Sequence, residues 1–197
     1  HWWGGLHWLV EDYIAAAGEA GLAYTPDFNG QTQEGAGNYQ MTIKGGRRNS
    51  AARAFLRPAM KRKNLQVITK AMVTRVLFEG TKAVGVEYQR GGETLQLRGA
   101  EVILAGGAIN SPQLLQLSGI GPADHLRDLG IPVVFDQPNV GANLQDHVDL
   151  FVIAECTGPH TYDRFAKPHL SALAALQYLL TRKGPVASSL FETGGFW

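Results

Sequence analysis

The fold of this chain is decided by residues 102–122, which read VILAGGAINSPQLLQLSGIGP. The apolar run Val102–Leu104 predicts a strand that is buried on both faces, as in a parallel sheet. The small residues Ala105–Gly107 follow it and predict a tight bend. Ser111 can then cap a helix whose first residue is Pro112, and the helix stops near Gly119. The order strand, bend, helix is typical of an α/β fold.

The bend at Ala105–Gly107 has two possible roles. Small residues remove side chains that would hold a ligand away from the backbone, and the N-terminus of the following helix offers N–H groups and a positive dipole to phosphate oxygens. A dinucleotide could therefore approach closely here. The alternative is tight packing of the helix on the strand, since the full glycine pattern GxGxxG is absent from this segment.

The segment that precedes the bend has an apolar period of two, which is typical of strands. Gly80-Thr81 and Gly91-Gly92 stand where hairpin turns would fall. The pattern therefore predicts a small antiparallel meander, so the α/β fold also contains α+β elements. The expected strands are Leu65–Thr69, Val73–Glu79, Ala83–Gln89, Thr94–Leu97 and Glu101–Leu104.

Helices and short strands are expected in the rest of the chain. Leu6–Ala20 has apolar residues at helical spacing, and Gly21 is a plausible stop. Asn49 and Ser50 can cap a helix that runs to Met60. The remaining expected elements are helices at Ala123–Leu129 and His169–Arg182 and strands at Val133–Phe135 and Val148–Ala154.

Composition restricts the classes of function. The net charge is +1, from 18 basic and 17 acidic residues without a long basic run, so no nucleic-acid partner is expected. Cys156 is the single cysteine, and the six histidines lack zinc-binding spacing, so neither a disulfide nor a metal site is expected. The apolar runs are far shorter than the ~20 residues of a transmembrane helix, so no transmembrane segment is expected.

The two ends of the sequence favour an interior fragment of a longer protein. Residue 1 is His1 rather than Met, and no signal peptide follows. At the other end the chain stops in the apolar run Gly194–Trp197. The location stays open, with the cytoplasm or a peripheral association with a membrane as the expectation.

Residues 106–122 closely resemble the second signature of the glucose-methanol-choline (GMC) oxidoreductases. Asn64–Tyr88 resembles the strand pair that passes the adenine end of FAD in this family, and Val140–His147 resembles the stretch between the FAD and substrate regions. Pro26–Gly30 with Gly46–Arg53 resembles the region before them. The stretches follow the family's order, and the resemblance, to the choline and alcohol dehydrogenase-like branch, covers roughly residues 6–197.

The resemblance implies a Rossmann-like FAD-binding region at 1–150 and the start of a substrate-binding region at 151–197. Such enzymes oxidise a primary alcohol by transferring a hydride from the carbinol carbon to flavin N5. The electron acceptor (a quinone, a carrier or oxygen) stays open, as does the identity of the alcohol. Two alternatives remain: an FAD-containing non-redox lyase on the same scaffold, or an inactive structural fragment.

The resemblance also assigns candidate site residues. Val73 matches the adenine-side strand, where main-chain groups bind FAD, and Ala105 and Gly106 lie at the strand end that would face it; ordinary core packing is the alternative for each. Glu192 resembles a carboxylate that faces the trimethylammonium group in choline-oxidising members, where charge attraction and aromatic rings favour a cation. The resemblance extends to relatives that act on aliphatic alcohols or polyethylene glycol, so Glu192 marks the substrate cavity better than it marks choline. An exposed glutamate at a strand end is the alternative.

No catalytic residue is assigned within this chain. The family's catalytic histidine lies in a C-terminal context that none of the six histidines matches. His147 stands in a polar stretch where a structural histidine in a turn is the simpler interpretation.

Overall fold

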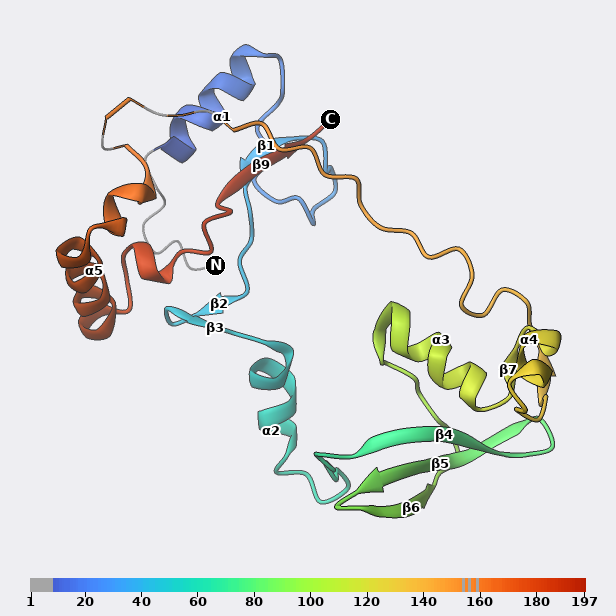
Figure 1. Ribbon diagram of the computed structural model, residues 1–197. Helices are drawn as coiled ribbons and strands as arrows, with labels where there is room; N and C mark the ends of the chain where they lie inside the picture. Colours follow the sequence, from blue (N-terminus) through green and yellow to red (C-terminus); the bar gives the residue numbers. More distant parts are fainter. Residues whose placement is uncertain (1–8, 154, 156, 159) are drawn as a thin grey trace. The chain divides into compact units, whose positions relative to one another are not determined.

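The computed structural model describes residues 9–153, 155, 157–158 and 160–197. The chain divides into two compact units (Figure 1). One unit is Gln66–Phe151, and the other combines the described residues within 1–65 and 152–197. None of the described helices is both long enough and apolar enough to cross a membrane.

The unit Gln66–Phe151 is built on an antiparallel sheet of three strands in the order β4-β5-β6. The sequence predicts all three strands, and the predictions are confirmed to within one residue at each end. The alternation of apolar and polar residues forms these strands because side chains of successive residues point to opposite faces. The strands are β4 (Met72–Glu79), β5 (Lys82–Arg90) and β6 (Glu93–Arg98).

Helix α3 (Gly107–Leu117) packs on β4, one of the two edge strands of this sheet. A short helix, α4 (Ala123–Asp128), follows it and is confirmed as predicted to within one residue. Leu126 of α4 is fully buried and anchors the turns around it. The strands β7 (Ile120–Gly121) and β8 (Phe135–Asp136) pair in parallel beside α4.

Some predicted strands are wrong. The segments Leu65–Thr69, Glu101–Leu104 and the described part of Val148–Ala154 form no strand. Ile103 is 80% exposed and Val152 is 96% exposed, so these apolar runs are not buried on both faces either. A strand is held by hydrogen bonds to a lateral partner, and the described strands pair only with one another.

The start of α3 also differs from the prediction. The helix begins at Gly107, about one turn before Ser111, and Pro112 lies inside it. The Ser111 hydroxyl oxygen accepts the backbone N–H of Gly106 at 3.0 Å. Ser111 therefore lies inside the helix, and its side chain accepts an N–H group at the helix start. The prediction that Ser111 is the N-cap residue is wrong.

The other unit joins segments from both ends of the chain. Strand β1 (Gly35–Asn38) pairs antiparallel with β9 (Thr193–Phe196), as Figure 1 shows. The rings of Phe28 and Phe196 lie 5.2 Å apart beside this pair. A contact therefore links the two predicted regions, 1–150 and 151–197; the position of the boundary between them stays a prediction.

The helices of this unit follow the predicted pattern. The predicted helix at Leu6–Ala20 is confirmed over its described residues, and the helices expected before Met60 and at His169–Arg182 are also found. The first turns after Ser50 are a π-helix rather than an α-helix. The elements are α1 (Leu9–Glu19), β2 (Ile43–Lys44), β3 (Arg47–Arg48), η1 (Ala52–Leu56), α2 (Arg57–Ala59), η2 (Tyr162–Ala166), α5 (Pro168–Thr181) and η3 (Pro185–Ala187).

Candidate cofactor and substrate sites

The unit Gln66–Phe151 contains a cavity of about 710 Å³ between β4, the segment before α3, and one side of α3 from Asn110 to its last residue, Leu117. All three residues predicted to contact a cofactor line this cavity: Val73, Ala105 and Gly106. Whether they bind a cofactor stays a prediction. The other lining residues are Met72, Thr74, Val86, Val102, Ile103, Leu104, Asn110, Ser111, Gln113, Leu114 and Leu117.

The cavity wall is electrically neutral. Its lining consists of apolar side chains, one amide each from Asn110 and Gln113, and the hydroxyl groups of Thr74 and Ser111. Because β4 is an edge strand, its outer backbone groups are available to partners other than a neighbouring strand. Such a wall can accept a flat, uncharged ring system that forms hydrogen bonds with the main chain.

A β-bulge lies directly beside Val73. The pairing of β4 with β5 shifts register between Val73 and Arg75. Thr74 donates its hydroxyl to the Glu87 carbonyl oxygen at 3.2 Å and to Glu87 Oε1 at 3.0 Å, one proton shared between two acceptors. Bulges change the direction of a strand and frequently occur next to functional sites, so the end of β4 that faces the cavity is held in a fixed, irregular geometry.

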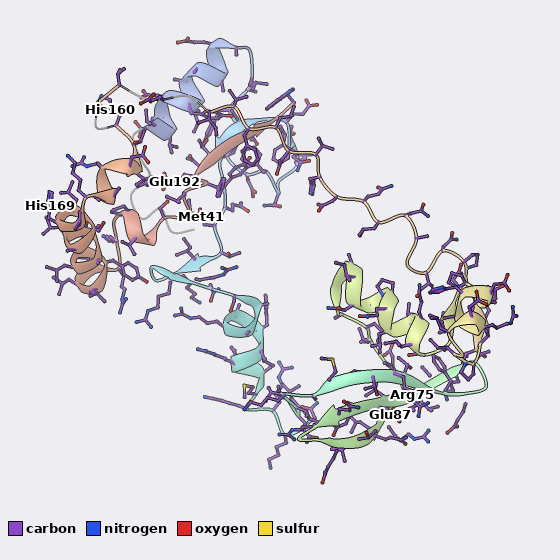
Figure 2. All side chains as sticks on the ribbon, viewed as in Figure 1. Met41, Arg75, Glu87, His160, His169 and Glu192 are labelled. Carbon is purple, nitrogen blue, oxygen red and sulfur yellow. The ribbon has the colours of Figure 1, made fainter. Side chains whose placement is uncertain are left out.

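The bulge is supported by an ion pair across the two strands. Arg75 donates from Nε to Glu87 Oε1 at 3.1 Å and from Nη2 to Glu87 Oε2 at 2.8 Å, and Figure 2 shows the two side chains together on the sheet. The hydrogen bond from Arg75 lowers the pKa of the Glu87 carboxyl, and the same contact raises the pKa of Arg75. The two-point contact fixes both side chains on the face of the sheet.

The two glycines of the bend differ in what they require. A Cβ atom on Gly106 would lie 3.2 Å from Asn110 Cβ and 3.4 Å from the Ser111 nitrogen, so packing within the helix start already favours a small residue. Gly107 has a φ of 86°, which L-amino acids rarely adopt, and a Cβ atom there would meet no other atom within 4 Å. Packing therefore accounts for Gly106 without a ligand, and backbone conformation accounts for Gly107.

Glu192 lies in the other unit and is only 5% exposed, so the alternative of an exposed strand-end glutamate is wrong. Its Oε1 atom accepts hydrogen bonds from the hydroxyl groups of Tyr162, at 3.1 Å, and Ser188. The residue is labelled in Figure 2 and directly precedes β9 in the chain. It lines a cavity of about 410 Å³ together with Leu9, Val10, Tyr13, Thr161, Tyr162, Leu190, Phe191 and Thr193.

Sequence reasoning missed Tyr162 and Ser188 as partners of Glu192. Tyr162 stands 30 residues before Glu192 in the sequence, so no local pattern indicates the contact. Ser188 stands close to Glu192, but the turn between them depends on Leu190, whose φ is 69°. A leucine in this conformation is not expected from sequence.

The histidines do not gather into a site within the described residues. The His147 backbone N–H donates to Asp146 Oδ1 at 2.8 Å in an exposed stretch, and residues 142–150 form no turn, helix or strand, so the predicted turn is not found. Among the described residues, no three histidine, cysteine, aspartate or glutamate side chains are close enough together to hold a metal ion.

Comparison with known proteins identifies the relatives of this chain. A family model described as "GMC oxidoreductase" matches residues 2–149. An oxygen-dependent choline dehydrogenase from Staphylococcus saprophyticus is 47% identical over 188 residues, which is 95% of this chain and 34% of that protein. A mitochondrial choline dehydrogenase from Homo sapiens is 50% identical over 185 residues, 93% of this chain and 31% of that protein.

The fold has a counterpart among solved structures. An FAD-dependent oxidoreductase from Chaetomium thermophilum matches with a TM-score of 0.77 and 30% identity, over 93% of this chain and 33% of that one. The chain therefore spans about a third of the length of each of these relatives.

Proposed function

Because the chain belongs to the GMC oxidoreductase family, we propose that it is part of a longer enzyme that oxidises a primary alcohol with FAD. The curated relatives at 47% and 50% identity are choline dehydrogenases, so choline is the first substrate to test. The observation that carries the proposal is the meeting of Val73, Ala105 and Gly106 on one neutral cavity within the residues that match the family.

The residues around this cavity fit a flavin nucleotide. The β4 end at Val73 would hold the adenine side through main-chain groups, and Ala105 and Gly106 would let the cofactor lie close to the backbone before α3. The N-terminus of α3, with 11 residues, adds a positive dipole that suits phosphate oxygens. We propose on the same grounds that residues 1–150 are part of a Rossmann-like FAD-binding region.

The chemistry divides between cofactor and protein. When bound, FAD supplies the acceptor for the hydride that leaves the carbinol carbon. The part of this chain is to orient the cofactor at β4 and α3, and to bind substrate at Glu192. We assign the residues from 151 onward to the start of the substrate-binding region, where the buried carboxylate of Glu192 would attract a cationic group of the alcohol.

The test is anaerobic spectroscopy of the purified parent enzyme. The visible absorbance of oxidised flavin should accompany the protein and should bleach when choline or another primary alcohol is added. Bound flavin that no alcohol bleaches would favour a non-redox lyase on the same scaffold, and protein without flavin would favour a structural role.

A pair of variants links this test to the cavity. Ala105→Trp places a large side chain in the cavity wall and should reduce the flavin content of the purified enzyme by about tenfold or more. Leu129→Trp changes a residue that is 61% exposed and does not line the cavity, and it should leave the flavin content unchanged. Equal flavin content in both variants would show that this cavity does not bind the flavin.

A further inference from the structure

The carboxylate of Glu192 is held by two hydroxyl groups from different parts of one unit. Tyr162 from η2 and Ser188 from the turn before β9 both donate to Oε1. We propose that Tyr162 and Ser188 are positioning residues that fix this carboxylate for the cationic group of the substrate and so set the enzyme's preference for charged over neutral alcohols. The inference rests on the proposed function, in which Glu192 binds substrate.

The direction of each hydrogen bond follows from its surroundings. The Ser188 oxygen accepts the backbone N–H of Leu190 at 2.9 Å, so its own proton is left to donate to Glu192. Burial raises the pKa of the Tyr162 phenol, and the negative charge of Glu192 adds to the effect. The phenol therefore stays protonated at neutral pH and acts as a donor.

The backbone of Glu192 is held as firmly as its side chain. Its carbonyl oxygen accepts the N–H of Tyr39 at 3.0 Å, which extends the β1–β9 pairing by one residue. Leu190 adopts a left-handed conformation with a φ of 69° in the turn that brings Ser188 to the carboxylate. Strained backbone of this kind persists where the surrounding contacts over-determine it, often at binding sites.

These contacts make Glu192 a pre-oriented charge. A side chain locked before binding loses little conformational entropy when a ligand arrives. The aromatic side chains of Tyr13 and Phe191 line the same cavity. A carboxylate with aromatic neighbours suits a quaternary ammonium group better than a neutral alkyl group of the same shape.

The experiment measures kcat and KM of the parent enzyme for choline and for its neutral isostere, in which carbon replaces the nitrogen. Tyr162→Phe keeps the ring and removes only the hydroxyl. This variant should raise the KM for choline by about tenfold, because a hydrogen bond to a charged group is lost, and leave the KM for the isostere and both kcat values within about twofold. Ser188→Ala should shift the choline KM in the same direction, and Ser188→Thr should restore it.

Matched controls come from the same unit. Tyr178→Phe removes a phenol that donates to the Gly46 carbonyl oxygen at 2.8 Å, and Ser189→Ala removes a hydroxyl that donates to the Phe191 carbonyl oxygen at 3.1 Å. Neither group contacts Glu192 in these bonds, so both variants should keep the wild-type ratio of the two KM values. Thermal unfolding of each variant verifies that it folds.

The outcomes distinguish a failure of the positioning role from a failure of the proposed function. If Tyr162→Phe and Ser188→Ala change the two KM values equally, or change neither, the positioning role is wrong while the oxidation of alcohols stands. If Tyr162→Phe does not fold, the Ser188 pair decides in the same way. A wild-type parent enzyme that oxidises no alcohol would instead overturn the proposed function.

Discussion

The side chain of Ser118 ties the edge of β4 to the end of α3. Its oxygen accepts the backbone N–H of Val76 at 2.8 Å, and its hydroxyl donates to the Leu114 carbonyl oxygen at 2.5 Å. Both Val76 and Ser118 are buried, at 5% and 7% exposure. One hydroxyl therefore has two roles. It accepts a buried N–H on the outer side of the edge strand β4, where no neighbouring strand could bind it, and it caps the helix that borders the neutral cavity.

Removal of this hydroxyl should destabilise the unit Gln66–Phe151. Ser118→Ala leaves the Val76 N–H buried without an acceptor, which costs about 1–3 kcal/mol. Hydrogen exchange of the β4 and α3 amides should become faster by the factor that corresponds to this loss of free energy. Thr81→Ala, at an exposed turn of the same sheet, is the control and should leave exchange unchanged. Unaltered protection of Val76 in Ser118→Ala would contradict the assigned role.

The Arg75–Glu87 pair should make this unit sensitive to acid. The contact holds the pKa of Glu87 below its usual value of 4.5 in the folded chain, so the unfolded chain binds the proton more readily. The stability from this pair is therefore fully present above pH 4.5 and is lost as pH falls through the folded-state pKa. Glu87→Gln should reduce proton uptake on acid unfolding by a fraction of a proton, measured from the pH dependence of urea unfolding.

The pair Arg98–Glu79 provides the comparison. Its side chains are 60% and 71% exposed, and the Nη1–Oε1 distance is 2.9 Å. Exposed pairs contribute little, so Glu79→Gln should change the neutral-pH stability by less than about 0.5 kcal/mol. If Glu79→Gln destabilises the unit more than Glu87→Gln does, the two-point contact at the bulge is not the ion pair that contributes more to stability.

A side chain at Gly107 should destabilise α3. The φ of 86° is unfavourable for any L-residue, and Gly107→Ala should cost about 1–2 kcal/mol for this reason alone, since the space around it is open. Gly99→Ala serves as the control, because Gly99 has no positive φ and its nearest contact would be 3.4 Å away. Thermal unfolding of both variants checks the prediction, and equal midpoints would contradict it.

A side chain at Gly37 should instead disturb the β1–β9 pair by collision. A Cβ atom there would lie 2.0 Å from the Thr25 carbonyl oxygen, a backbone atom that cannot rotate away. Gly37→Ala should cost about 2 kcal/mol or more, since overpacking of a buried site forces the backbone to shift. Gly18→Ala, in α1 with open space around it, should stabilise the same unit by about 0.5–1 kcal/mol. Denaturant unfolding should show shifts of opposite sign.

Local patterns were sufficient for some elements and insufficient for others. Apolar alternation predicts β4, β5 and β6, because consecutive antiparallel strands find their partners along the same stretch of chain. The same reasoning predicts strands at Val102–Leu104 and Val148–Ala154 and is wrong at the first and over the described residues of the second, because an apolar run becomes a strand only beside a partner.

The candidate sites show the same division. The residue types and the resemblance to a known family indicated the candidate site residues Val73, Ala105, Gly106 and Glu192. They did not indicate the side chains around them. The bulge at Thr74 and the hydroxyl groups of Tyr162 and Ser188 become visible only in three dimensions.

The amino-acid sequence alone was enough to identify the family and to predict the elements whose partners are close neighbours in the sequence. Tertiary structure alone decided that Glu192 is buried, that Ser118 joins β4 to α3, and that β1 pairs with β9. The reason is physical: periodicity reports which face of a local element is apolar, whereas burial and hydrogen bonding of a single group depend on distant residues that folding brings to it.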